Sequence, residues 1–292
     1  MVVPVFINQQ QIGLRLLELP SDVVNLVESE SAPTLFLKSS ETSTQHAQSS
    51  GNAVLCTPSK TFPIRQVHSS NVLYILQQTA ESGYSAIAQC KGMLELVPSQ
   101  EDVLTQVRQQ LPVHALGITT RINVTRIALS ERTPFSEGEI EDALRELCVF
   151  EEGGILCIPS VTNLREAWNS LLTAATINGV KLDQLWNIAD MEKQVIEDQI
   201  NIEIYRAVVR RLSESPSLLE AKLDAAQTTA WVGSVLLASS EKATYEKSFV
   251  AQWQDQLPES WRELANMKLL QASLLFGVVL WLTVTRTSTV LL

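Results

Sequence analysis

Residues 56–76, CTPSKTFPIRQVHSSNVLYIL, constrain the fold more than any other stretch of the 292-residue chain. Turn-forming residues occur in this stretch twice, and an apolar run of strand length follows each of them. Pro63 has no backbone N–H, so it fits an edge or an irregular ladder position better than a central strand. We therefore predict turns at residues 58–60 and 69–71 and strands at residues 62–65 and 72–76.

Further apolar runs in the first hundred residues have the length of β-strands. They are residues 14–19, 34–37, 54–56 and 93–97. About six short strands, separated by turns and by a polar run at residues 38–52, predict an antiparallel sheet or barrel. A sheet of this size exposes unpaired backbone groups at its edges unless something covers them. Two interpretations stay open: a barrel that closes on itself, and a partial barrel completed by strands of partner chains.

The rest of the chain carries apolar residues at helical spacing. Ser136 and Glu139 have the spacing of a capping box, and Gly153-Gly154 precedes a strand-sized run at residues 155–158. Helices are predicted near residues 99–111, 136–148, 163–172, 182–188, 191–212, 218–238, 249–257 and 261–270, with a linker at residues 113–135 that includes a β segment near residues 122–127. Helices interrupted by a short strand fit winged-helix units or a plain helical bundle, so the fold class is α+β.

The charge balance bears on the partners of the chain. Residues 1–133 hold nine basic and ten acidic residues, whereas residues 134–292 hold 13 and 22. This balance argues against a chain that coats nucleic acid nonspecifically, because such binding needs clustered lysines and arginines. A local basic face is still allowed, and the best candidate for phosphate contact is Arg206, Arg210 and Arg211, with a solvated helix face as the alternative.

No motif for phosphate binding, nucleophilic catalysis or metal ligation occurs in the sequence. The four cysteines, Cys56, Cys90, Cys148 and Cys157, include no CxxC pair and are predicted to be buried thiols. Acidic clusters stand at predicted helix starts, where the helix dipole favours them. We therefore expect a protein that is not an enzyme and has no cofactor or metal site.

Residues 269–284 form a run almost without charge, LLQASLLFGVVLWLTV. This run is shorter than the ~20 residues that an α-helix needs to span a bilayer. A segment that is buried or covered by a partner is one interpretation, and a tail anchor is the other.

Residues 56–76 resemble the most characteristic block of the "defective in sister chromatid cohesion" family, a subunit of the alternative replication factor C clamp loader. The shared pattern is a Cys, a Lys-Thr pair, a strand with apolar and basic residues, and Ser and Asn before a Leu-rich strand. Blocks at residues 16–20, 94–98 and 249–258 agree in order, so the resemblance covers residues 14–270. The matching positions predicted to bind partners are Leu17, Glu18, Leu19, Cys56, Lys60, Thr61, Ile64, Arg65, Gln66, Ser69, Asn71 and Leu73.

The resemblance implies a noncatalytic nuclear subunit of a clamp loader that loads or unloads the sliding clamp PCNA during DNA replication. Such a subunit supports sister chromatid cohesion. Its N-terminal sheet is expected to join strands of two partner subunits, and its winged-helix units to reach DNA polymerase epsilon and DNA. The expected domains are residues 1–112 for partner binding, 113–135 as a linker, 136–240 as a winged-helix or helical domain, and 241–292 as an incomplete second winged-helix unit with an atypical apolar C-terminus.

Two functions of other classes stay open. The three arginines fit a stand-alone winged-helix DNA-binding regulator, and residues 269–292 fit a tail-anchored membrane protein. Within the clamp-loader interpretation, we expect Arg65, Gln66 and Asn71 to fix the pairing between this sheet and the partner strands.

Overall fold

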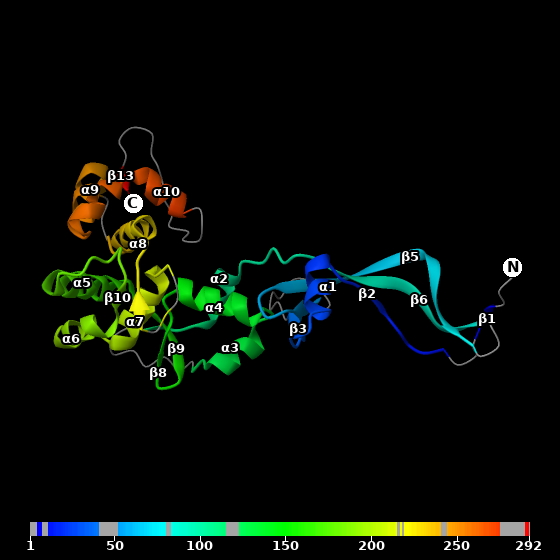
Figure 1. The fold of residues 1–292 in the computed structure, drawn as a ribbon. Helices are drawn as coiled ribbons and strands as arrows, with labels where there is room; N and C mark the ends of the chain where they lie inside the picture. Colours follow the sequence, from blue (N-terminus) through cyan, green and yellow to red (C-terminus); the bar gives the residue numbers. More distant parts are fainter. Residues whose placement is uncertain are drawn as a thin grey trace. The chain divides into compact units, whose positions relative to one another are not determined.

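The structure, a computed structural model, is a mixed α+β protein (Figure 1). It describes residues 5–7, 11–40, 52–79, 83–114, 123–214, 217, 219–240, 244–274 and 290–291. Most of the predicted polar loop and of the apolar run after residue 274 lies outside these residues. The chain forms two compact units, the first from residues 1–103 and 130–141 and the second from residues 104–129 and 142–292.

The first unit contains a curled, six-stranded sheet that forms a half-barrel (Figure 1). Its strands are β1 (Val5–Ile7), β2 (Leu16–Glu18), β3 (Phe36–Ser40), β4 (Asn52–Cys56), β5 (Thr61–Gln78) and β6 (Tyr84–Leu96). The strand order is β1-β6-β5-β4-β3, and β2 also pairs with β6. Strands β3 to β6 are antiparallel, as predicted, but β1 and β2 run parallel to β6.

Strand β5 continues through the second predicted turn, so that prediction was wrong. The β5–β6 register passes from His68 opposite Gly92 to Leu73 opposite Cys90, and the polar residues between them form a bulge. A Cβ atom on Gly92 would lie 2.6 Å from the carbonyl oxygen of Val67, so the close approach of the strands requires glycine here. The reason for the error is that a bulge absorbs turn-forming residues without reversing the chain.

The first predicted turn is confirmed, because it joins β4 to β5. The backbone N–H of Thr57 donates to the Lys60 carbonyl at 2.9 Å, and the Thr57 hydroxyl accepts from the Lys60 N–H at the same distance. Pro63 forms the last pair between β5 and β4, opposite Val54. Pro63, which has no backbone N–H to donate, therefore lies at the position where the pairing between β4 and β5 ends.

One face of the sheet carries a small apolar core. Val23, from a helix that the sequence did not predict, α1 (Ser21–Val27), packs there with buried side chains of β4, β5 and β6. These are Leu55, Phe62 and Leu96. The sequence also missed the first half of β6, where Ala86, Ala88 and Cys90 alternate inward.

Beyond the sheet the chain is mostly helical. The helices are α2 (Val103–Gln110), α3 (Arg126–Arg132), α4 (Glu137–Glu146), α5 (Val161–Asn178), α6 (Ala189–Glu197), α7 (Ile202–Leu212), α8 (Ala225–Ala238), α9 (Glu246–Asp255), the 3₁₀ helix η1 (Glu259–Leu264) and α10 (Met267–Leu274). Short strands lie between them: β7 (Val113–His114), β8 (Phe150–Glu152), β9 (Ile155–Pro159), β10 (Trp186–Asn187), β11 (Glu220–Ala221), β12 (Thr244–Tyr245) and β13 (Val290–Leu291).

Local capping explains several helix boundaries. Ser136 and Glu139 form the predicted capping box, in which the Glu139 N–H donates to Ser136 Oγ at 3.2 Å and Ser136 Oγ donates to Glu139 Oε2 at 2.7 Å. Helix α5 begins at an N-cap, Ser160, and ends at Gly179 with φ of 64°. These terminal contacts satisfy backbone groups that have no partner within the helix itself.

Three predictions in this part were wrong. The expected helix at residues 182–188 contains strand β10 instead, and the expected helix at 191–212 is divided into α6 and α7 by a break that includes Gln199, with φ of 59°. Part of the β segment expected near residues 122–127 is the start of helix α3. Apolar spacing alone does not show where a buried run changes its backbone conformation.

A large core fills the second unit, with buried side chains from Cys148 to Leu270. Trp168 and Trp253 are its largest fully buried members, and their indole N–H groups donate to the carbonyls of Gln256 and Thr229. Gly233 lies directly against the Trp253 ring. Helix α8 continues through this glycine without a break. Glycine is needed at position 233 because the Trp253 ring occupies the space that a side chain would need.

Candidate partner-binding edge and arginine groove

Strand β5 offers the longest unpaired edge in the first unit. It pairs with β6 along almost its whole length, but with β4 only at residues 61–63. From residue 64 to residue 78, no strand among the described residues pairs with the opposite side of β5. We call this side the open edge. Unpaired strand edges are templates for the addition of another strand.

Exposed apolar side chains gather on the strands around the open edge. Those of β5 and the neighbouring end of β6 are Val72, Leu73, Tyr74, Leu76 and Tyr84; on the far side of β6, β1 exposes Val5, Phe6 and Ile7. The outer strand β3 exposes Phe36 and Leu37, the latter with 71% of its surface accessible. The alternation in residues 84–96, which the sequence analysis overlooked, is the signal that could have located the β6 part of this surface.

The predicted partner-binding residues divide into an outward and an inward set. The outward set is exposed and consists of Leu17, Glu18, Lys60, Arg65, Gln66, Asn71 and Leu73. Arg65 donates to Glu95, its cross-strand neighbour on β6, at 2.6 Å, and Lys60 lies 3.4 Å from Asp22 of α1. Surface ion pairs of this kind contribute about 0–1 kcal/mol, so they leave the side chains available for other contacts.

The inward set consists of Leu19, Cys56, Thr61 and Ile64. Leu19 and Ile64 pack against the small core, while Cys56 and Thr61 are 1% and 4% exposed. The Thr61 hydroxyl donates to Glu139 and accepts from the Ser136 N–H at 2.7 Å. Residues 56 and 61 therefore serve contacts inside the unit. Ser69 belongs to β5, at the bulge.

Residues 130–139 are fastened to the sheet at further points. The Lys38 ammonium on β3 donates to the carbonyls of Phe135 and Ser130, at 2.6 and 2.9 Å. The Gly138 N–H donates to the Pro58 carbonyl at 2.8 Å, in the β4–β5 turn. A Cβ on Gly138 would lie 2.9 Å from that same oxygen, so the turn and the start of α4 approach as closely as glycine allows. Sequence reasoning did not find Lys38, because its acceptors are backbone carbonyls.

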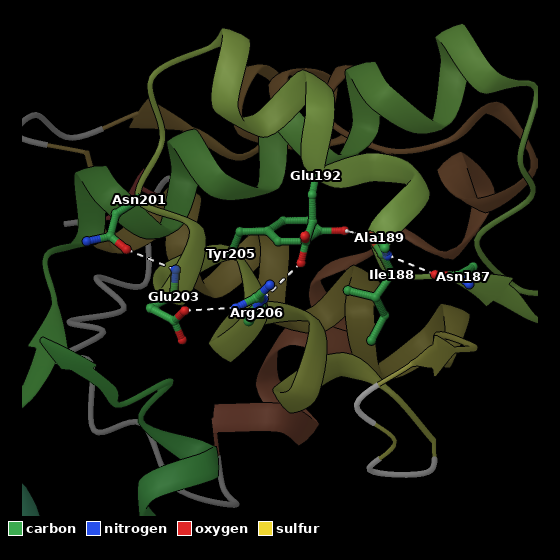
Figure 2. Close-up of polar contacts among 8 residues, drawn as sticks. All are labelled: Asn187, Ile188, Ala189, Glu192, Asn201, Glu203, Tyr205 and Arg206. Carbon is green, nitrogen blue, oxygen red and sulfur yellow. Dashed lines mark hydrogen bonds and ion pairs between the residues drawn. The ribbon is translucent and has the colours of Figure 1, made fainter.

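The three arginines of α7 do not form a single patch. Figure 2 shows Arg206 between two carboxylates: its Nε donates to Glu192 at 2.8 Å and its Nη1 to Glu203 at 2.9 Å. The Arg206 pKa is raised above its usual value, and the hydrogen bond to Glu192 is the largest cause. Desolvation opposes this rise, but the hydrogen bonds and charges of Glu192 and Glu203 together outweigh it. Arg211 is paired with Glu146 and only 11% of its side chain is exposed. Arg210 makes no ion pair with any described residue.

Arg206 and Arg210 line a groove of about 380 Å³ in the second unit. Its other walls are the end of β10, the first turns of α6 and α7, and the segment before β11, which contribute Asn187, Ile188, Ala189, Glu192, Glu203, Ser217 and Leu219. Two of the polar groups in this region bond to the protein itself: Asn187 accepts from the Ala189 N–H, and the buried Tyr205 hydroxyl donates to the Ile188 carbonyl (Figure 2). The two acidic and two basic side chains of the groove balance in formal charge.

Within the described ranges, no group of three or more His, Cys, Asp or Glu side chains is placed to hold a metal ion. In the same part of the chain, no helix combines the length and the apolar character that crossing a membrane requires. All four cysteines are free thiols, and burial raises the pKa of Cys56 and that of Cys148, the latter to about 12.

Comparison with the models of known protein families shows the family to which the chain belongs. The model of the family described as sister chromatid cohesion protein Dcc1 matches residues 14–286. The chain belongs to this family. The match includes the residue 56–76 block, both units, and residues beyond the end of the resemblance noted from the sequence. Among curated proteins, none matches the chain.

Membership in the Dcc1 family implies a role in sister chromatid cohesion. The family consists of cohesion-related accessory proteins and is not a known enzyme family. It suggests that the chain acts as a subunit of a complex, and chromosome cohesion is consistent with a nuclear location.

Proposed function

We propose that this protein is a noncatalytic subunit of an alternative, replication factor C-like clamp loader in the nucleus. The complex loads or unloads PCNA during DNA replication and thereby supports cohesion. The sheet of the first unit binds two partner subunits, whose strands complete the half-barrel. The second unit links the loader to DNA polymerase epsilon.

The observation that carries this proposal is the open edge of β5. No described strand pairs with this side of β5 from residue 64 to residue 78, and exposed apolar side chains lie along the strand. A soluble protein rarely leaves such an edge uncovered, because it invites aggregation. Addition of a partner strand would satisfy the backbone groups and bury the apolar side chains. Leu17, Glu18, Lys60, Arg65, Gln66, Ser69, Asn71 and Leu73 are the residues that we assign to this contact.

The order of elements supports winged-helix units in the chain. A helix, a strand, two helices and a returning strand occur as α5, β10, α6, α7 and β11, with β10 and β11 antiparallel and Ser213 bridged to Leu223. After α8, which lies within residues 136–240, the elements β12, α9, η1, α10 and β13 follow part of this plan without its first helix, and β12 and β13 are antiparallel. We propose that residues 136–240 and 241–292 act as two such units after a partner-binding domain at residues 1–112 and a linker at residues 113–135.

Contact with DNA is a separate proposal, and it rests on α7. Arg206 and Arg211 are each held by carboxylates, so Arg210 is the arginine best placed to meet a phosphate. Replacing Arg210 with Ala should lower DNA affinity and flatten its salt dependence by about one counterion, since one phosphate contact is lost. If the variant and the wild type bind DNA with equal affinity and equal salt dependence, α7 does not contact DNA through Arg210.

Co-purification tests the proposed function. The full chain, expressed with clamp-loader subunits, should copurify with them, and Leu73→Asp should weaken that association because it places a charge on the open edge. Leu185→Asp is the matched control, since Leu185 is an equally large, exposed apolar residue of the second unit. The proposal fails if the wild-type chain stays alone, or if the two variants behave alike.

A further inference from the structure

Residues 130–139 and the sheet are joined by a set of contacts that we call the clasp. Its members on the sheet are Lys38 of β3, Pro58 of the β4–β5 turn and Thr61 of β5. Its members on the other side are Ser130, Thr133, Phe135, Ser136, Gly138 and Glu139. All of these residues lie in the first unit.

The clasp covers the face of the sheet opposite the small core. In the register of β3, β4 and β5, Lys38 pairs with Val54, and Cys56 pairs with both Phe36 and Thr61. Cross-strand partners share a face, so these side chains point to one side and Leu55 with Phe62 to the other. Strand β4 is therefore buried on both faces, by α1 on one and by residues 130–139 on the other.

The Lys38 ammonium has no carboxylate partner in these contacts. It is held by the carbonyls of Ser130, Thr133 and Phe135, around the C-terminal end of α3, where the helix leaves unsatisfied acceptors. A hydrogen bond from a charged donor to a carbonyl is stronger than a hydrogen bond between two neutral groups. Lys38 thus ties the outer strand β3 to residues 130–135.

We infer that Lys38 and Thr61 are positioning residues for assembly: through the clasp they hold β3 and the start of β5 in the geometry that a partner needs. Neither side chain contacts the partner in this account. Thr61 sits two residues before Pro63, where β5 leaves β4 and the open edge begins. This inference rests on the proposed assembly function and assigns Thr61, and Cys56 beneath it, to the inside of the unit.

The Cys56 thiol reports directly on the clasp. It is buried, 3.7 Å from the Thr61 hydroxyl and 4.0 Å from the Pro134 carbonyl, so a reagent reaches it only when the clasp opens. Cys148, in the core of the second unit, reports on unfolding of that unit in the same molecule. Alkylation of both thiols is followed by mass spectrometry on the full chain, for the wild type, Thr61→Val, Thr61→Ser and Lys38→Met.

Thr61→Val keeps the shape of the side chain and removes its hydrogen bonds. It should raise the alkylation rate of Cys56 about tenfold, which corresponds to about 1.4 kcal/mol of easier opening, and leave Cys148 unchanged. Lys38→Met should act in the same direction, whereas Thr61→Ser keeps the hydroxyl and should restore the wild-type rate. If Thr61→Val leaves the alkylation rate of Cys56 unchanged, or raises that of Cys148 equally, the clasp does not control access to Cys56 and the inference is wrong.

Association with clamp-loader subunits is measured on the same variants. Thr61→Val and Lys38→Met should associate several-fold more weakly than wild type, and Thr61→Ser normally. If Cys56 becomes reactive while association stays at the wild-type level, the positioning role is wrong although the clasp exists. If the wild-type chain itself does not associate, both the proposed function and the positioning role are wrong. The alkylation rates of Cys56 then still show whether the clasp protects this thiol.

Discussion

The two units of this protein bury their apolar residues to very different extents. The second unit packs tryptophans, leucines and valines into one large core, with Trp168 and Trp253 fully enclosed. The described part of the first unit buries fewer large apolar side chains, among them Val23, Leu55 and Phe62, while Phe36, Leu37 and Leu73 are exposed on its strands. A unit that exposes more large apolar residues than it buries in its core is suited to completion by another chain. The difference agrees with our proposal that the second unit folds around its own core and the first unit binds partner chains.

The largest effect is expected in the core of the second unit. Trp253→Ala should lower the free energy of unfolding by about 3–5 kcal/mol, because it leaves a cavity against Gly233 and Thr229. Chemical denaturation of the full chain measures it. An effect below about 1 kcal/mol would mean that this unit is not the self-sufficient one.

A smaller loss is expected from overpacking the same site. Gly233→Ala places a Cβ 2.6 Å from the Trp253 ring, and forcing the ring to move should cost about 1–3 kcal/mol. Serine at the same position should be at least as destabilising. A neutral or stabilising Gly233→Ala, as expected for an open helical site, would contradict the packing described here.

Substitutions of exposed residues on the strands of the sheet should separate stability from assembly. Arg65→Ala and Leu37→Ala should change the free energy of unfolding by less than about 0.5 kcal/mol, since both side chains are exposed. The same variants should weaken association with partners. Arg65→Glu is a less clean test, because it places two carboxylates opposite one another at Glu95 and adds a repulsion within the sheet.

The smallest effect concerns thiol chemistry. Burial raises the pKa of Cys148 to about 12, so its alkylation should remain slow up to pH 10, where an exposed thiol is largely ionised. The partly exposed Cys157 should react much faster under the same conditions. Because the folded-state pKa is raised, this group leaves stability unchanged at neutral pH and lowers it as the pH rises above about 9.

Local sequence signals predicted part of this fold and failed at identifiable places. The capping box at Ser136 and Glu139 and the turn at residues 58–60 were found, because each depends on neighbours within four residues. The bulge of β5 was missed, since only the pairing with Gly92 on another strand distinguishes it from a turn. The division of residues 191–212 into two helices depends on packing, which periodicity does not encode.

The candidate site shows the same limit. The resemblance pointed to residues 56–76, but it could not separate residues that face outward from those that face inward. Lys60 and Thr61 are adjacent in sequence, yet one is exposed and the other is buried under Ser136. The three arginines looked like one basic patch until the positions of Glu146, Glu192 and Glu203 placed carboxylates on two of them.

Amide hydrogen exchange of β5 tests the central claim most directly. The full chain is compared alone and in complex with copurified clamp-loader subunits, with peptides that cover residues 64–78. The account predicts that amides pointing away from β6 exchange readily in the free chain and become protected in the complex, because a partner strand pairs with them. Unchanged exchange along residues 64–78 in a complex that has formed would contradict it, and would place the partner on another surface.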